Sequence, residues 1–209
     1  ERKQTKVGLR LPSLCILSHT HPGNSYLESG ESMDYTVAMQ RAIALAEKGL
    51  GKTAPNPIVG AVIIDSTGAV IAEGFHDRNQ SSDHAEIVAI KAAGEKSKGS
   101  TIVVTLEPCN HTGNTGPCVQ AIIDAGITTV VFAVSDPNEK AAGGADALRA
   151  AGITVVEGVM RDEAAFSNRA WLMKIRKNRP FFTWKVAATL DGKVAAADGT
   201  SKWITNEAS

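Results

Sequence analysis

The sequence predicts a three-layer α/β/α fold built around a mixed β-sheet. Near the start of the folded part of the chain, two β-rich runs are separated by a short polar turn, which indicates a β-hairpin. After this hairpin, helical and strand-like segments alternate, a pattern typical of parallel strands covered by helices. Because the hairpin is antiparallel and the alternating part parallel, one sheet that contains both must be mixed.

Composition indicates a globular chain without a strong electrostatic partner. The 209 residues include 22 Lys and Arg against 22 Asp and Glu, and 43% are hydrophobic. A net charge of zero argues against nucleic-acid or membrane-surface binding. No apolar run approaches the roughly 18 residues of a membrane helix, and no signal segment opens the chain. Three cysteines do not make a secreted disulfide framework, so we expect a soluble, cytoplasmic protein.

The first elements are a helix and the hairpin. Asp34 is the expected N-cap of the helix and Gly49 its C′ residue, since apolar residues between them recur with helical spacing. The run 58–64 is the first expected strand, 65–68 a turn and 69–72 the second strand.

The rest of the chain then alternates. Helices are expected at 84–93, 118–125, 145–151 and a longer one at 162–177, and strands at 101–105, 128–134 and 153–156. Pro180 interrupts this pattern, and a further strand at 181–188 and a turn at Asp191–Gly192 follow. We therefore expect a disordered extension at 1–32, a folded domain at 33–178, and the beginning of a second, incomplete domain at 179–209, because one strand cannot bury a core.

Three candidate metal ligands lie at predicted element junctions. His84 opens one helix, Cys109 follows a strand, and Cys118 opens the next helix. One imidazole and two thiolates suit zinc, and three protein ligands leave a fourth position for water, as in catalytic sites. Zinc lowers the pKa of such a water to about 7. Glu86, two residues after His84, is placed to carry protons between water and a leaving amine.

Other interpretations of these residues are open from the sequence. Cys109 and Cys118 could form a disulfide or be two core thiols, and His84 could simply begin a helix. Together and in this order, however, the residues match the zinc-deaminase pattern of His-x-Glu followed by Pro-Cys and a second Cys. That pattern has two residues between its cysteines, whereas eight lie between Cys109 and Cys118.

With this longer spacing, the chain closely resembles the bifunctional riboflavin-biosynthesis deaminase/reductase family from about residue 33 to 209. The matching motifs are Asn56-Pro57-Ile58-Val59-Gly60, His84-Ala85-Glu86, Thr105-Leu106-Glu107-Pro108-Cys109-Asn110-His111, Asp136-Pro137-Asn138, Leu190-Asp191-Gly192-Lys193 and Ser201-Lys202-Trp203-Ile204-Thr205. The resemblance implies a cytidine-deaminase-like fold, followed by the first strand and loop of a dihydrofolate-reductase-like domain.

The resemblance also implies a reaction. The deaminase would hydrolyse 2,5-diamino-6-(5-phosphoribosylamino)pyrimidin-4-one to 5-amino-6-(5-phosphoribosylamino)uracil and ammonia, with Zn²⁺ held by His84, Cys109 and Cys118 and with Glu86 as the catalytic proton carrier. In the family, a second domain then reduces the ribose with NADPH. A small-molecule substrate and a homo-oligomer follow from the same resemblance.

Further site residues carry over from the family. Substrate-binding positions of the deaminase correspond to Asn56, His76, His111, Asp136 and Asn138. Two of these have plainer interpretations, since Asn56 could be only a turn residue between two prolines and His76 only the end of a strand. Asn114 occupies a position that is often basic in the family, and a neutral amide cannot clamp a phosphate as Lys or Arg would.

In the tail, the resemblance places Ser201 at a substrate-contacting position of the reductase and Ala187 and Trp203 at NADPH-contacting ones. Most of the reductase domain would follow Ser209, so we expect no reductase activity from this chain. Two other functions compete with the deaminase: another zinc deaminase acting on cytidine, deoxycytidylate or a tRNA adenosine, and a non-catalytic zinc-stabilised module. The cysteine spacing and the tail argue against the first, and Glu86 against the second.

Overall fold

The computed structural model describes residues 33–111, 116–138 and 142–201, so the expected disordered extension at 1–32 lies outside the described residues. The elements in chain order are α1 (Thr36–Glu47), β1 (Gly60–Ile64), β2 (Val70–Phe75), α2 (Ala85–Ala93), a 3-10 helix (Gly94–Ser97), β3 (Thr101–Leu106), α3 (Cys118–Asp124), β4 (Thr129–Val134), α4 (Gly144–Ala150), β5 (Thr154–Glu157), α5 (Arg161–Ser167) and α6 (Arg169–Lys177). None of the described helices is long and apolar enough to cross a membrane.

The sheet is mixed, as predicted. In the described residues its strand order is β2-β1-β3-β4-β5, with β1 antiparallel to both β2 and β3 and with β3, β4 and β5 parallel. Asp65 closes the hairpin turn by accepting hydrogen bonds from the backbone N–H groups of Thr67 and Ala69 at 2.8 and 3.0 Å. The expected hairpin followed by α–β alternation is therefore confirmed.

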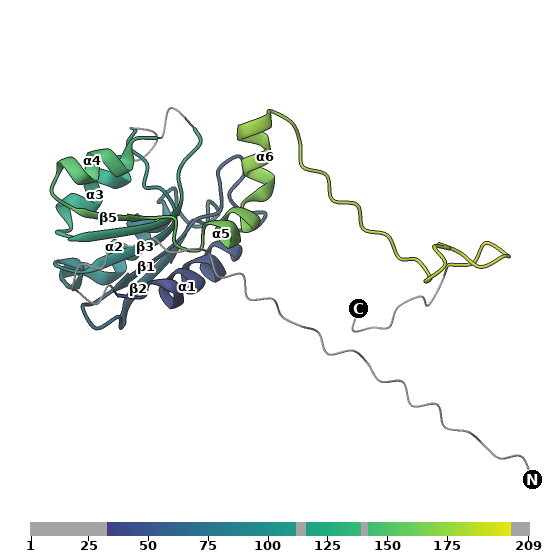
Figure 1. Cartoon of the computed structure of the whole chain (residues 1–209), viewed down its shortest axis with the longest axis horizontal. Helices are drawn as coiled ribbons and strands as arrows, with labels where there is room; N and C mark the ends of the chain where they lie inside the picture. The colour runs from purple at the N-terminus through teal and green to yellow at the C-terminus, as the bar shows by residue number, and fades with distance from the viewer. Residues whose placement is uncertain (1–32, 112–115, 139–141, 202–209) are drawn as a thin grey trace, which may run out of the picture. The chain divides into compact units, whose positions relative to one another are not determined.

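Helices cover both faces of the sheet (Figure 1). On β1, Ala61 and Ile63 face the apolar cluster that includes α2, α3 and α4, whereas Val62 and Ile64 face the cluster that includes α1, α5 and α6. Because side chains alternate across a strand, a strand covered on both faces is apolar throughout. The α/β/α layering predicted from the sequence is confirmed.

The prediction of one long helix at 162–177 is wrong, because the structure has two helices there, α5 and α6, which are separated at Asn168. The Asn168 side chain is buried and hydrogen bonds to the backbone of Ile58, a residue far away in the sequence. A side chain that forms hydrogen bonds with the backbone polar groups of a distant segment can interrupt a helix that the local apolar periodicity favours.

The expected strand at 181–188 is also absent, since these residues have no regular secondary structure and are exposed. A strand needs neighbours that supply hydrogen bonds, and none pairs with this segment among the described residues. The turn after it is present, with the Gly192 N–H donating to the Thr189 carbonyl at 2.9 Å.

Most other boundaries differ from the expected ones by one to three residues. The N-cap of α1 is Tyr35 and not Asp34, although the Asp34 carboxylate accepts the Thr36 N–H at 2.9 Å, and Gly49 follows the C-cap Lys48 as predicted. The first strand begins at Gly60, not at residue 58.

Candidate active site

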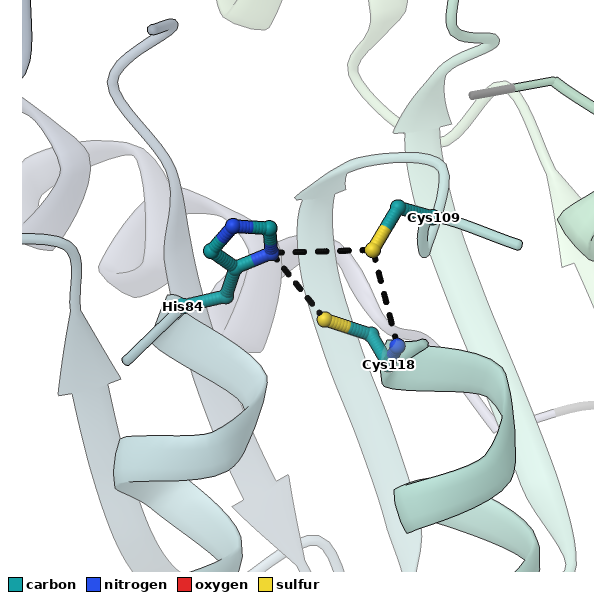
Figure 2. Close-up of side chains that lie close together, drawn as sticks. All are labelled: His84, Cys109 and Cys118. Atoms are coloured by element: carbon teal, nitrogen blue, oxygen red, sulfur yellow. Dashed lines mark hydrogen bonds between the residues drawn. The ribbon is translucent and has the colours of Figure 1, made fainter. Parts of the chain in front are cut away.

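The predicted metal ligands His84, Cys109 and Cys118 lie together at the ends of three elements (Figure 2). His84 is the N-cap of α2, Cys109 follows β3, and Cys118 is the first residue of α3. His84 Nδ1 lies 3.2 Å from Cys118 Sγ and 3.6 Å from Cys109 Sγ, and all three ligand atoms lie within 4.8 Å of one another.

A close approach between α2 and β2 places His84. A Cβ atom built on Gly74 of β2 would lie 2.3 Å from the carbonyl oxygen of Ala85 and 2.6 Å from the amide nitrogen of Ala89. Only glycine therefore allows the first turn of α2 to rest on the strand. This contact fixes where the helix begins, and with it the position of His84 beside the two cysteines.

The donor set fits zinc. Tetrahedral zinc with Zn–N of about 2.0–2.1 Å and Zn–S of about 2.3 Å separates its ligand atoms by about 3.6 Å, which is close to the distances found here. Both cysteines are free thiols, so the disulfide interpretation is wrong. With three protein ligands the site has the donor number of catalytic zinc centres.

The pKa values of the two cysteine thiols are shifted in opposite directions. A hydrogen bond with the Cys118 thiol is the largest influence on Cys109 and, helped by His84, lowers the pKa of Cys109 to about 4 despite burial. The same hydrogen bond, together with burial, raises the pKa of Cys118. The Cys118 backbone N–H also points at Cys109 Sγ, at 3.5 Å. One thiolate is thus already favoured before any metal binds, and thiolates are the form that binds zinc.

Glu86 is buried beside the ligand cluster. Its side chain lies on the first turn of α2, is 3% exposed, and lines the same cavity as His84 and Cys109. Burial is the largest influence on this carboxyl and raises its pKa. A buried carboxyl with a raised pKa suits general acid–base catalysis.

The cavity has a volume of about 230 Å³. All five residues predicted to contact the deaminase substrate line it, namely Asn56, His76, His111, Asp136 and Asn138. They come from separate loops: one before β1, one after β2, one after β3 and one after β4. The structure therefore brings together the residues that the sequence motifs place far apart.

His76 presents an unpaired ring nitrogen in this cavity. Its Nδ1 lies 2.8 Å from the Asp83 carbonyl oxygen, and because a carbonyl only accepts, Nδ1 carries the proton. Its Nε2 is then an acceptor, and within the described part of the chain it is the buried side-chain nitrogen or oxygen that has no hydrogen-bond partner. A buried acceptor without a partner is costly, so a ligand donor is the natural complement.

Asp136 and Asn138 form a short turn at the cavity. The Asp136 carboxylate accepts the Asn138 backbone N–H at 2.8 Å. Burial, aided by the charges of Glu107 and Cys109, raises the pKa of Asp136. Asn56 is part of a turn as well, since its N–H donates to the Thr53 carbonyl at 2.8 Å. It also lines the cavity, so both interpretations of this residue apply.

Two of the residues assigned to the reductase do not line this cavity. Ala187 and Ser201 are exposed and do not line it, and Trp203 lies outside the described residues, as does Asn114.

Several residues that line the cavity were not predicted as site residues, and three of them shape it. Glu107 is buried and lies in the sequence between the end of β3 and Pro108. Trp171 and Ile175 line the cavity from α6. The spacing of Trp171 and Ile175 places both on one face of a helix, but that pattern alone indicates only packing. Nothing local shows that this face closes a cavity.

Comparison with known proteins identifies the class. Residues 33–134 match the family "Cytidine and deoxycytidylate deaminase zinc-binding region", a range that includes His84, Glu86, Cys109 and Cys118. The fold and the ligand cluster therefore place the chain in the class of zinc-binding deaminase domains.

Longer matches narrow this class. The chain is 49% identical over 172 residues to riboflavin biosynthesis protein RibD of Mycobacterium tuberculosis, covering 82% of this chain and 50% of that protein, and 46% identical over 169 residues to RibD of Escherichia coli, covering 80% and 46%. It superposes with a TM-score of 0.77 on the diaminohydroxyphosphoribosylaminopyrimidine deaminase/5-amino-6-(5-phosphoribosylamino)uracil reductase of Thermotoga maritima, at 47% identity over 82% of this chain and 50% of that one. The chain belongs to this RibD family of riboflavin-biosynthesis deaminases, and it spans about half the length of these relatives.

Proposed function

We propose that this chain catalyses the hydrolytic deamination of 2,5-diamino-6-(5-phosphoribosylamino)pyrimidin-4-one, giving 5-amino-6-(5-phosphoribosylamino)uracil and ammonia. One observation carries the proposal: the buried Glu86 carboxyl lines the same cavity as the His84, Cys109 and Cys118 ligand cluster. A purely structural metal site has no use for a buried proton carrier and usually closes its fourth position with another protein ligand.

The chain's own residues divide the work. His84 Nδ1 and the two Sγ atoms would hold zinc, which when bound would lower the pKa of a water to about 7 and so supply a nucleophile at neutral pH. As a water oxygen bonds to the ring carbon that bears the 2-amino group, Glu86 would pass one water proton to the adjacent ring nitrogen and the second to the departing 2-amino nitrogen. The carbon–nitrogen bond breaks, the water oxygen becomes the new carbonyl, and the nitrogen leaves as ammonia.

Recognition of the ring falls to the cavity loops. His76 Nε2 accepts a hydrogen bond from the substrate, because its own ring proton is committed to the Asp83 carbonyl. Asn56, Asp136, Asn138 and His111 add polar groups around the pyrimidine and its ribosylamino substituent. The cavity and the net charge of zero favour a free small molecule and not a nucleic acid as substrate.

The test is ammonia release by zinc-quantified protein, with cytidine as the competing substrate. We expect release from the pyrimidinone, about one zinc per chain, and little release from cytidine. Glu86→Gln should keep the zinc and lower turnover by about 10²–10⁴-fold. Glu73→Gln changes a partly exposed carboxylate of β2 that pairs with Arg41 of α1, and it should behave as wild type. Full turnover by Glu86→Gln would remove Glu86 from the mechanism.

We further propose that residues 179–209 open an NADPH-dependent reductase region, in which Ala187 and Trp203 contact NADPH and Ser201 contacts the substrate. The tail motifs of the sequence support this assignment. This chain with the deaminated product and NADPH should then oxidise no NADPH, while a chain extended to the length of its relatives should oxidise it. We also propose that the protein is cytoplasmic and forms a homo-oligomer. Light scattering on the purified chain would test the oligomeric state.

A further inference from the structure

The Glu107 carboxylate is buried at the junction between the metal loop and the substrate cavity. It is 7% exposed and follows directly on β3, two residues before Cys109. No ion pair with a Lys or Arg side chain is found for it in the described residues. A buried carboxylate without a cation needs hydrogen bonds in compensation.

Backbone N–H groups supply those hydrogen bonds, one to each carboxylate oxygen. Oε2 accepts the N–H of Asp136 at 3.1 Å, and Oε1 accepts the N–H of Ala145 at 3.0 Å. Asp136 lies just after β4, and Ala145 lies in the first turn of α4. One carboxylate thus ties together both ends of the connection between β4 and α4.

The same region is held tightly against the metal loop. A Cβ atom on Gly144 would lie 1.9 Å from the Pro108 carbonyl oxygen, so α4 begins in direct contact with the residue that precedes Cys109. The Glu107 N–H also donates to the Val134 carbonyl at 2.8 Å, which continues the pairing of β3 with β4. The backbone of Glu107 is therefore fixed at the end of the sheet, and its carboxylate fixes the position of the connection between β4 and α4.

We propose that Glu107 is a positioning residue for substrate binding. Its two oxygens hold the 136–138 turn so that Asp136 and Asn138 face the cavity at a fixed distance from the zinc ligands. This inference rests on the proposed function, because it assigns substrate contact to that turn. Glu107 itself neither ligates the metal nor carries a proton in the reaction.

The decisive variant is Glu107→Gln. Its amide keeps one acceptor oxygen and replaces the other with an NH₂ donor, so one of the two backbone N–H groups loses its acceptor. Since hydrogen bonds to charged groups are among the stronger ones in proteins, we expect KM for the pyrimidinone to rise about tenfold. Zinc content should be unchanged and kcat should stay within about threefold of wild type. Glu157→Gln, the same substitution at an exposed carboxylate on β5, is the matched control and should leave KM unchanged.

A double variant tests whether Glu107 acts through the turn. If it does, Glu107→Gln combined with Asp136→Asn should raise KM by clearly less than the product of the two single effects, because the second substitution removes one of the two groups that Glu107 positions. Independent, multiplying effects on KM would overturn the proposal. So would a lower melting temperature with unchanged KM, or a loss of zinc, since these would make the role structural or assign it to the metal site.

Hydrogen exchange separates this inference from the proposed function. In Glu107→Gln at least one of the two amides, that of Asp136 or that of Ala145, should exchange at least tenfold faster than in wild type, while in Glu157→Gln neither should change. This measurement needs no substrate, so it holds or fails even if the wild-type chain releases no ammonia. Should Glu107→Gln not fold, the shorter carboxylate of Glu107→Asp, which keeps the charge but cannot span both amides, should show the same faster exchange; unchanged exchange would overturn the proposal.

Discussion

The Asn168 side chain pairs with both backbone polar groups of Ile58. Its Oδ1 accepts the Ile58 N–H at 3.1 Å, and its Nδ2 donates to the Ile58 carbonyl at 2.7 Å. The pair is buried and mimics the hydrogen bonding of a neighbouring strand. It joins the point where α5 meets α6 to the segment that follows the Asn56 turn, so it fixes two walls of the cavity relative to each other.

Replacing Asn168 by Ala should destabilise the protein. Two buried backbone groups of Ile58 would lose their partners, which costs about 1–3 kcal/mol each, so the free energy of unfolding should fall by about 2–6 kcal/mol. The control is Ser167→Ala, one residue before Asn168, which removes an exposed hydrogen bond to Glu47. It should lower the free energy of unfolding by less than about 0.5 kcal/mol. Denaturant unfolding measures both, and equal effects would contradict the role given to the Asn168 pair.

Trp171→Ala should weaken substrate binding. Trp171 is half-buried on α6 and lines the cavity, so its loss removes apolar contact worth about 1–2 kcal/mol, or about tenfold in KM. The control is Trp184→Ala, because Trp184 is 87% exposed and lies outside the cavity. Steady-state kinetics on both variants would show whether α6 is a wall of the substrate site; an unchanged KM in Trp171→Ala would show that it is not.

Removal of zinc should lower stability as well as activity. A ligand that binds only the folded state stabilises by about 4 kcal/mol at a thousand times its Kd, which corresponds to about 10 °C in Tm for a chain of this size. Chelation should therefore lower Tm by about that amount, and added zinc should restore it. In Cys109→Ala, which lacks one ligand, Tm should be low and insensitive to the chelator. A wild-type Tm that does not respond to chelation would argue against a bound metal.

The pH dependence of stability should change in Asp136→Asn. Burial raises the pKa of Asp136 above its ordinary value of 3.8, so the folded state favours the protonated form. The stability this group contributes is fully present below that ordinary value and is lost as pH rises through the raised pKa. An amide stays neutral and avoids this loss, so at pH 7 the Tm of the variant should exceed that of wild type by about 1–3 °C. The difference should vanish near pH 3.5, and a difference that persists there would point to another cause.

The same substitution should weaken substrate binding. Because Asp136 faces the cavity, Asp136→Asn should raise KM while it raises Tm at neutral pH. Such a trade between stability and activity is common where a functional site holds a group that the fold alone would not favour. A variant that is both more stable and equally active would place Asp136 outside the binding site.

The residues of the metal cluster could be predicted because each belongs to a short motif with its own chemistry. His84 and Glu86 are neighbours on one helical turn, and each cysteine follows a proline at an element junction, so local sequence contains the residue types and their order. The layers of the fold follow in the same way, since the periods of apolar residues are local properties. These features do not depend on knowing which distant segments meet.

The remaining features depend on contacts between segments that are far apart in the sequence. The break at Asn168, the carboxylate of Glu107 between two backbone amides and the wall formed by α6 all arise where separate segments meet. Likewise, the segment at 181–188 has strand-like composition but no neighbour to pair with among the described residues. The sequence by itself determined the layers, the candidate zinc ligands and the candidate proton carrier, because local patterns contain them. Only the tertiary structure decided where helices break and which side chains close the cavity, because a buried polar group takes its partner from whichever segment the fold brings beside it.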